Sequence, residues 1–157
     1  MTAVNRVWKE YKELSREEAK NGPDKEITLC PVDDASMFEW KAVISGPPGS
    51  PFAGGKFELS LKVPDTYPLI PPTAKFITPV FHPNVHFKTG EICLDILKTA
   101  WTPAWTLQSV CRAIIALLDD PDSSSPLNCD AGNMVRAQDM RAYRSMARMF
   151  IDKAGMN

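Results

Sequence analysis

Cys93 and Asn84 are the residues of this sequence whose types and spacing suggest chemistry. Asn84 closes a His-Pro-Asn tripeptide, and Cys93 follows nine positions later (93 − 84) at the start of a short apolar stretch. No second cysteine is near enough in sequence to form a redox dithiol or a zinc knuckle with Cys93. A thiol nucleophile close to a side-chain amide suits acyl transfer, because the amide can donate to the developing oxyanion.

The neighbours of Cys93 favour one kind of acyl transfer. Glu91 and Asp95 are acidic and disfavour a thiolate. Neither a nearby histidinium nor a helix N-terminus, which activate protease thiols, is evident. We therefore expect thioester exchange, in which one thiol replaces another at little change in free energy, rather than attack on amides.

Two residues of the His-Pro-Asn tripeptide have more than one interpretation. The Asn84 amide could donate to an oxyanion or brace the loop through backbone bonds, and the two roles are compatible. His82 precedes a proline and is biased to extended geometry. We expect its ring to hold the loop by a hydrogen bond rather than to transfer protons.

The same residues could build two other sites. His82 and His86 have the spacing of a zinc pair that Cys93 could complete, but Pro83 interrupts the helix such a pair usually needs. His82, Asn84 and Cys93 could form a hydrolase triad, but such triads are assembled from distant segments. We expect neither, and predict no metal site and no cofactor.

Residues downstream of Cys93 are predicted to support or extend the site. Trp101 is expected to pack against the loop. Pro103 and Ala104 are small residues at a predicted loop tip, so we expect them to contact a partner. Cys111 falls on the apolar face of a predicted helix and should be a core thiol.

Hydrophobic periodicity predicts the elements that hold these residues. A helix over residues 3–20 follows from apolar residues at helical spacing, namely Val4, Val7, Trp8, Tyr11 and Leu14. Segments between turn residues predict a four-stranded antiparallel meander at residues 26–31, 38–45, 56–63 and 74–78.

Three further helices are predicted toward the C-terminus. The first starts after Thr106 as N-cap and ends near Asp120-Pro121, and a short one covers residues 131–136. The last starts near Asp139 and should turn four residues inward: Met140, Tyr143, Met146 and Phe150. Helix, strands and helices in separate blocks indicate the α+β class.

Composition bounds the domain organisation and the partners. The 157 residues suit a single domain, residues 1–157, and the net charge of −1 gives no footprint for nucleic-acid binding. Four irregularly spaced cysteines are typical of cytosolic thiols. The first residues lack the apolar stretch of a signal peptide, and no apolar run is long enough for direct membrane insertion. We expect a cytoplasmic protein.

Five motifs in order make the chain resemble the ubiquitin-conjugating enzyme (E2) family. They begin at residues 46–55 (Gly-Pro-Pro-Gly-Ser-Pro-Phe-Ala-Gly-Gly), and the others lie at residues 67–72, 82–84, 90–97 and 101–104. The resemblance implies the E2 (UBC) fold and an acyltransferase in which Cys93 carries ubiquitin as a thioester. Ubiquitin would come from an activating enzyme (E1), which is the protein that uses ATP.

Residues 85–91, 105–117 and 125–133 resemble one branch of that family, the peroxisomal E2, a ubiquitin-conjugating peroxin. This resemblance implies that a cysteine of the peroxisomal import receptor is monoubiquitinated so that the receptor can be recycled. It also implies that a membrane-anchored peroxin recruits the enzyme to the cytosolic face of the peroxisomal membrane.

The resemblance also assigns surface contacts. Arg6 and Lys9 on the first helix would meet the activating enzyme. Leu69, Pro103 and Ala104 would meet a RING ligase (E3). Of these, Leu69 occupies a position that is often aromatic in members serving many ligases.

The loops around Cys93 depart from the family pattern in two places. The spacing from Asn84 to Cys93 is one residue longer than in most members, so the loop must bulge. Ser125 stands where an acidic residue often helps to deprotonate an incoming lysine. We therefore expect a cysteine-accepting or ligase-dependent enzyme, with His82, Asp122 and Ser125 as support for the active-site loop.

Two alternatives remain open from the sequence. One is a general cytosolic E2 that conjugates lysines on many targets. The other is a non-catalytic ubiquitin-binding scaffold with an E2-like fold, which the presence of Cys93 and Asn84 disfavours.

Overall fold

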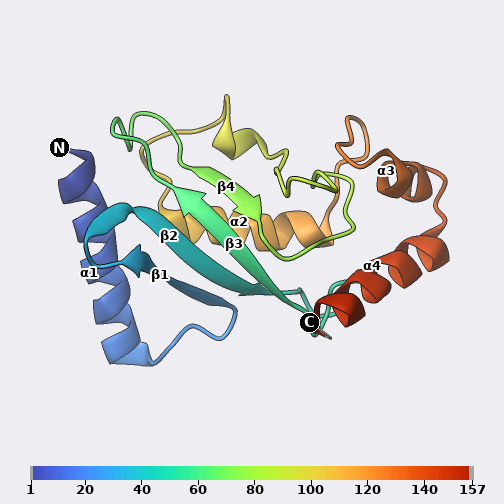
Figure 1. The fold of residues 1–157 in the computed structure, drawn as a ribbon, viewed down its shortest axis with the longest axis horizontal. Coiled ribbons are helices and arrows are strands. Elements are labelled where there is room, and N and C mark those ends of the chain that lie inside the picture. The colour runs from blue at the N-terminus through green and yellow to red at the C-terminus, as the bar shows by residue number, and fades with distance from the viewer. Residues whose placement is uncertain (1, 156–157) are drawn as a thin grey trace.

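The computed structural model describes residues 2–155, which form one antiparallel sheet with helices at its face and at both ends (Figure 1). The elements in chain order are α1 (Ala3–Asn21), β1 (Ile27–Asp33), β2 (Ser36–Ser45), β3 (Lys56–Lys62), β4 (Thr73–Phe76), the 3₁₀ turn η1 (Asp95–Leu97), α2 (Leu107–Asp119), α3 (Cys129–Arg136) and α4 (Met140–Gly155). The predicted α+β class and the order of its elements are confirmed.

The sheet is the predicted meander, with its strands in the order β1-β2-β3-β4. Residues facing the core alternate along β2 and β3, and the pairs Trp40↔Leu61 and Ala42↔Leu59 bring them opposite one another. β1 extends two residues beyond its predicted end at Pro31, to Asp33. Pro31 is tolerated because β1 is an edge strand, and the register shifts just after it.

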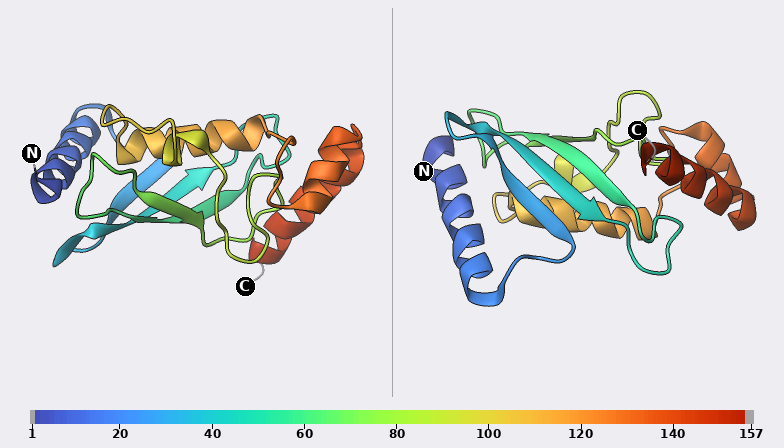
Figure 2. Two further views of the ribbon diagram at one scale, coloured as in Figure 1. Left: turned by 90° about the horizontal axis from the view of Figure 1, so that it is seen from above. Right: turned by 60° about the horizontal axis from the view of Figure 1, so that its bottom comes forward.

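α2 lies across one face of the sheet and completes the core (Figure 2). Thr106 is its N-cap, as predicted, and forms a capping box with Ser109. The buried residues of the helix recur at the predicted spacing: Leu107, Val110, Cys111, Ile114 and Leu118. Cys111 is a core thiol, and burial raises its pKa to about 12.

α1 forms as predicted but turns a different face toward the core. Its buried residues are Ala3, Val7 and Glu10, whereas Trp8 and Tyr11, which were expected inside, are 41% and 37% exposed. Val4 was also expected inside and is exposed. The prediction was wrong because apolar residues cover a wide arc of this helix, and only one edge of that arc meets β2.

α3 and α4 pack on each other at the end of the sheet away from α1 (Figures 1 and 2). Tyr143 is buried, and Met146 and Phe150 are partly buried, but Met140 is exposed and its predicted inward position was wrong. Met140 is the first residue of α4, ahead of the turn that reaches the core. No helix within residues 2–155 is both long and apolar enough to cross a membrane.

Candidate active site

Cys93 lies just before η1, in a segment that has neither strand nor α-helix, and its side chain is partly exposed. Its backbone N–H donates to the carbonyl of Asn84 at 2.8 Å. A bridge between Val85 and Ile92 continues this pairing. The two residues expected to do chemistry are therefore neighbours in space as well as in sequence.

The predicted bulge between Asn84 and Cys93 is a tight turn built around His86. The His86 Nδ1 accepts from the backbone N–H groups of Lys88 and Thr89, at 3.1 and 3.2 Å. Gly90 closes the turn with φ of 76°, and a Cβ at this position would lie 2.0 Å from the carbonyl oxygen of Phe76. Only glycine meets both conditions, so the turn has a fixed shape.

The Asn84 side chain is 2% exposed and is held at both ends by one residue. Its Nδ2 donates to the carbonyl of Asp122 at 2.7 Å, and its Oδ1 accepts from the Asp122 N–H at 2.8 Å. These contacts are those of a brace between the Cys93 loop and the loop after α2. An amide fixed in this way is also positioned without any reorganisation, as an oxyanion donor would need to be.

His82 is fully buried, and both of its ring nitrogens are occupied. Nδ1 accepts from the Asn84 N–H at 3.0 Å, and Nε2 lies 2.8 Å from the carbonyl of Leu117. Accepting at Nδ1 and donating from Nε2 requires the neutral ring. Burial lowers the His82 pKa to about 4. A ring committed in this way provides neither a triad base for Cys93 nor a zinc ligand.

The loop after α2 carries the other two predicted support residues. Asp122 supports Asn84 through its backbone, while its own carboxylate accepts from the N–H and hydroxyl of Ser124, at 3.0 and 2.6 Å. These bonds lower the pKa of the Asp122 carboxyl. Ser125 is exposed on the same loop.

The residues predicted to contact other enzymes lie on α1 and on two loops. Lys9 is exposed on α1, Leu69 is 78% exposed, and Pro103 and Ala104 form an exposed turn. Arg6 differs from them. Its side chain is only 15% exposed and donates to three acceptors inside the molecule. The structure thus gives Arg6 an internal role in place of a free surface position.

Two buried polar residues, Glu10 and Tyr67, are absent from the predicted site. Glu10 is 5% exposed and Tyr67 is 1% exposed, and a hydrogen bond of 2.5 Å joins them. The spacing of Arg6 and Glu10, one helical turn apart, was the only signal in the sequence. Tyr67 could not be linked to them because it lies 57 residues beyond Glu10.

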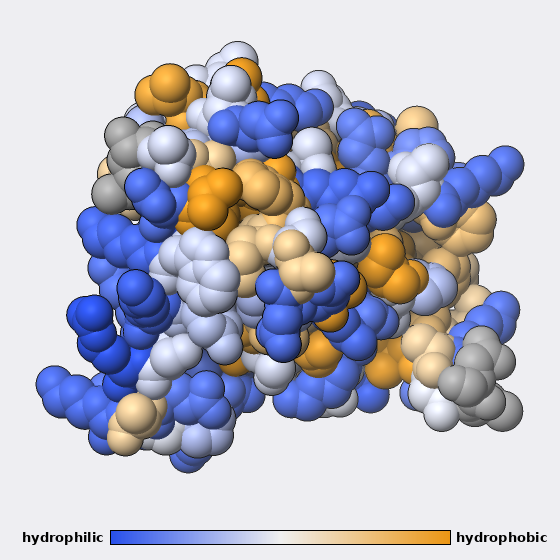
Figure 3. Space-filling view, turned by 60° about the vertical axis from the view of Figure 1, so that its left-hand side comes forward, coloured by the Kyte–Doolittle hydropathy of each residue, from blue (hydrophilic) through white to orange (hydrophobic). Residues whose placement is uncertain are grey.

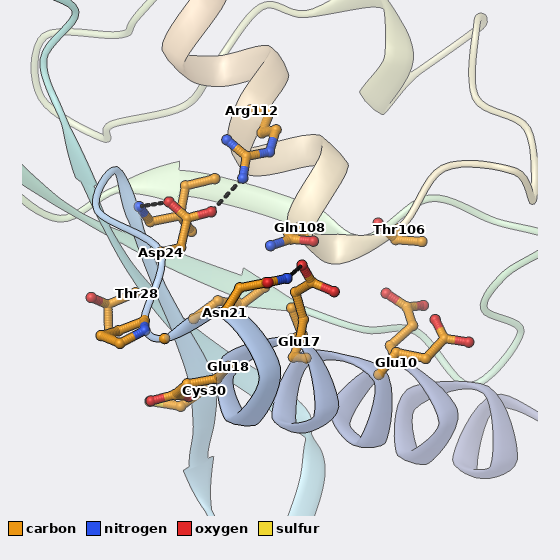
Figure 4. Close-up of a pocket in the computed structure, with 16 residues that line it drawn as sticks. Glu10, Glu17, Glu18, Asn21, Asp24, Thr28, Cys30, Thr106, Gln108 and Arg112 are labelled. Carbon is orange, nitrogen blue, oxygen red and sulfur yellow. Dashed lines mark hydrogen bonds and ion pairs between the residues drawn. The ribbon is translucent and has the colours of Figure 1, made fainter.

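A groove of about 630 Å³ lies between α1, β1 and the first turns of α2 (Figure 4). Acidic residues of α1 line one wall, and Arg112, paired with Asp24, lies on the other. Neither Cys93 nor Asn84 lines this groove. The groove is therefore separate from the Cys93 loop.

Comparison with known proteins gives a consistent set of relatives. The family model described as "Ubiquitin-conjugating enzyme" matches residues 6–151. The chain is 57% identical to Protein PEROXIN-4 of Arabidopsis thaliana, over 96% of this chain and 94% of that protein. It is 56% identical to the ubiquitin-conjugating enzyme E2 pex4 of Dictyostelium discoideum, over 92% and 94%.

Solved structures agree with these relatives. The crystal structure of H. polymorpha ubiquitin conjugating enzyme Pex4p, in complex with the soluble domain of Pex22p, superimposes with a TM-score of 0.90. Its sequence is 40% identical, and the match covers 96% of both chains. An E2 domain from Toxoplasma gondii matches with a TM-score of 0.82 at 31% identity, over 96% of this chain and 97% of that one.

Proposed function

The chain belongs to the ubiquitin-conjugating enzyme family, and we propose that Cys93 is the residue on which it carries ubiquitin. Ubiquitin arrives from the activating enzyme and leaves, with the help of a RING ligase, to a cysteine of the peroxisomal import receptor. Modification with a single ubiquitin then marks that receptor for recycling.

Each step is an exchange at one acyl carbon. The Cys93 thiolate attacks the thioester carbonyl between ubiquitin and the activating enzyme, and the thiolate of that enzyme leaves. In the second step the acceptor thiolate attacks the new thioester, and the Cys93 thiolate leaves. Each exchange forms one thioester and breaks one, so neither step needs an oxidant or a cofactor.

The observation that carries this proposal is the contact between Cys93 and Asn84. The thiol is partly exposed on a loop whose position is set by the Asn84 brace and by the buried His82. The charge that develops in thioester exchange lies on the carbonyl oxygen, which one amide donor can stabilise. A side chain that accepts the attacking thiol's proton is not needed when the attacker is already a thiolate.

The serine at position 125 favours a cysteine over a lysine as the acceptor of ubiquitin. A lysine has to lose a proton before it attacks, and a carboxylate near the thioester would assist that loss. Ser125, on the loop that Asn84 braces, offers a hydroxyl in its place. A cysteine becomes a thiolate at a much lower pH than a lysine becomes a neutral amine, so a cysteine acceptor suits this site better.

Relatives support the peroxisomal placement. The Arabidopsis thaliana relative is named Protein PEROXIN-4, and the H. polymorpha relative was solved with the soluble domain of Pex22p. We propose that a membrane-anchored peroxin of that kind recruits this chain to the cytosolic face of the peroxisome. Purified peroxisomal membranes should retain the chain until that peroxin is removed, whereas a general cytosolic E2 would not be retained.

The acceptor preference can be tested with a preformed ubiquitin thioester of wild type and of Ser125→Asp. Discharge to free lysine, without a ligase, should be at least about tenfold faster for Ser125→Asp, because the new carboxylate can accept the proton. Discharge to free cysteine should be the same for both proteins. A wild-type enzyme that discharges to lysine as fast as Ser125→Asp would refute the cysteine preference.

A further inference from the structure

Glu10 is a carboxylate buried between α1 and the start of α2. Figure 4 shows it on the side of α1 that faces the first turn of α2. Its Oε1 accepts from the N–H of Leu107 at 2.8 Å, and its Oε2 accepts from Arg6 and Tyr67 at 2.9 and 2.5 Å. Leu107 opens α2, where backbone N–H groups have no partner within the helix. Glu10 therefore joins two helices and the loop that carries Tyr67.

Arg6 extends the same cluster to the turn that precedes α2. Its Nε donates to Glu10, and one terminal nitrogen donates to the carbonyls of Pro103 and Trp105, both at 2.9 Å. Its guanidinium also lies 5.5 Å from the centre of the Tyr67 ring, within the range of a cation–π contact. Arg6 thus fixes the turn that exposes Pro103 and Ala104.

Tyr67 fixes the loop that exposes Leu69. Its ring is buried against Trp101, with the ring centres 5.9 Å apart, and the Trp101 indole N–H donates to the carbonyl of Pro68 at 2.8 Å. Burial and the adjacent Glu10 carboxylate raise the Tyr67 pKa, so the hydroxyl remains a donor at physiological pH. Leu69, two residues further on, is 78% exposed.

The cluster and the exposed residues occupy one side of the molecule. Figure 1 places the N-terminal half of α1 and the loop between β3 and β4 at the same end. Figure 3 shows this side facing forward, with apolar surface exposed between hydrophilic residues. Arg6 contacts the turn at residues 103–105, Tyr67 belongs to the loop that exposes Leu69, and Glu10 bonds to both Arg6 and Tyr67.

We propose that Arg6, Glu10 and Tyr67 are positioning residues that hold Leu69 and the Pro103–Ala104 turn in one docking surface for the activating enzyme and the RING ligase. The inference rests on the proposed function, because it takes those exposed residues as contacts of the two enzymes. It moves Arg6 from the docking surface to the support beneath it.

A buried ion pair is a poor way to gain stability, because apolar side chains of similar size often serve as well. The cluster instead fixes the relative positions of the segments that it joins. Four hydrogen bonds of 2.5–2.9 Å tie α1 to Tyr67, to the turn at residues 103–105 and to Leu107. A docking surface assembled from three separate segments needs such fixed relative positions.

Two variants separate positioning from general stability. Glu10→Gln keeps the shape of the side chain but removes the charge, and Tyr67→Phe removes one hydroxyl donor. Glu13→Gln makes the same chemical change at an exposed position of α1 and is the matched control. Each protein would be charged by ubiquitin-activating enzyme with ATP and ubiquitin. Its thioester would then be discharged with and without a RING domain that stimulates wild type.

Glu10→Gln should raise the KM of the activating enzyme for this substrate by about tenfold and reduce the RING stimulation by a similar factor, with a smaller effect for Tyr67→Phe. The kcat of charging and the discharge without ligase should follow the Glu13→Gln control. A merely structural defect would also reduce the kcat of charging and the discharge without ligase, relative to the Glu13→Gln control, and that result would overturn the inference.

The controls also separate this inference from the proposed function. If wild type forms no thioester, the proposed function fails. If wild type is charged and Leu69→Ala lowers RING stimulation while Glu10→Gln and Tyr67→Phe do not, the positioning inference alone fails. If Glu10→Gln does not fold, Tyr67→Phe still decides the matter, because its buried ring keeps the contact with Trp101.

Discussion

At the scale of single residues, Asn84 braces the active-site loop and is also the proposed oxyanion donor. Both ends of its side-chain amide bond to the backbone of Asp122, and its backbone carbonyl accepts from the N–H of Cys93. The amide can brace the loop continuously and still present its second N–H hydrogen during the reaction. Separating the tasks requires measurements of stability and of rate on the same variants.

Asn84→Ala is expected to lower the free energy of unfolding by about 1–3 kcal/mol, because the N–H and C=O of Asp122 lose their partners. It should also slow ligase-free discharge by about 10²-fold if the amide stabilises the oxyanion. Asn84→Asp keeps an acceptor for the Asp122 N–H but loses the donor. Urea unfolding and single-turnover discharge measure the two effects. A variant that loses stability while keeping its discharge rate would leave Asn84 with the bracing role alone.

His82 predicts a pH dependence of stability. Its pKa is about 4 in the folded protein against the ordinary 6.5, so the neutral ring stabilises the fold fully above pH 6.5. Below pH 6.5 the unfolded chain binds a proton that the folded protein does not. The free energy of unfolding should therefore fall by about 1.4 kcal/mol per pH unit until about pH 4, a total on the order of 3 kcal/mol.

Urea unfolding between pH 7 and pH 4 measures this effect, with His82→Gln as the reference that cannot titrate. The difference between the two proteins isolates His82 from the carboxylates. The His82 ring resonances of the folded protein should also show no titration step near pH 6.5. A step at that pH, or the same pH dependence in His82→Gln, would contradict the assignment of a neutral structural ring.

At the scale of elements, Gly90 fixes the shape of the turn between Asn84 and Cys93. Gly90→Ala places a Cβ 2.0 Å from the Phe76 carbonyl and should destabilise the fold by about 2–4 kcal/mol. Gly54→Ala is the matched control, because Gly54 has φ of 81° but open space where a Cβ would lie. It should cost only about 1 kcal/mol. Equal costs in thermal unfolding would show that the close approach to Phe76 contributes nothing.

Elements defined by local pattern were predictable, and their orientations were less so. The capped helix after Thr106 and the four strands follow from periodicities of 3.6 and 2 and from turn residues. The buried face of α1 does not, because Glu10 enters the core in place of Trp8. A buried glutamate is favourable only with partners, and two of its three partners lie 57 and 97 residues away.

The site divides in the same way. Cys93, Asn84 and His82 lie within one short stretch. Their residue types and order were therefore enough to predict a nucleophile, an amide donor or brace, and a supporting ring. The partners Asp122 and Leu117 come from the end of α2 and the loop after it, and only the fold brings them to Asn84 and His82. The internal partners Pro103 and Trp105 of Arg6 could not be predicted for the same reason.

At the scale of the whole molecule, α2 connects the proposed docking surface with the active-site loop around Cys93. Its first N–H donates to Glu10 in the cluster under the docking surface. The carbonyl of Leu117, near its other end, bonds to the ring of His82 beside the active-site loop. The 13 residues of this helix span about 20 Å. One rigid element thus sets the distance between the docking surface and Cys93.

The central claim is that Cys93 carries ubiquitin as a thioester, and a charging reaction with activating enzyme, ATP and ubiquitin tests it most directly. Wild type should form an adduct with one ubiquitin that reductant removes, on paired non-reducing and reducing gels. Cys93→Ala should form none, and Cys93→Ser should form an ester that resists reductant. An adduct that persists in Cys93→Ala, or none in wild type with an active activating enzyme, would contradict the account.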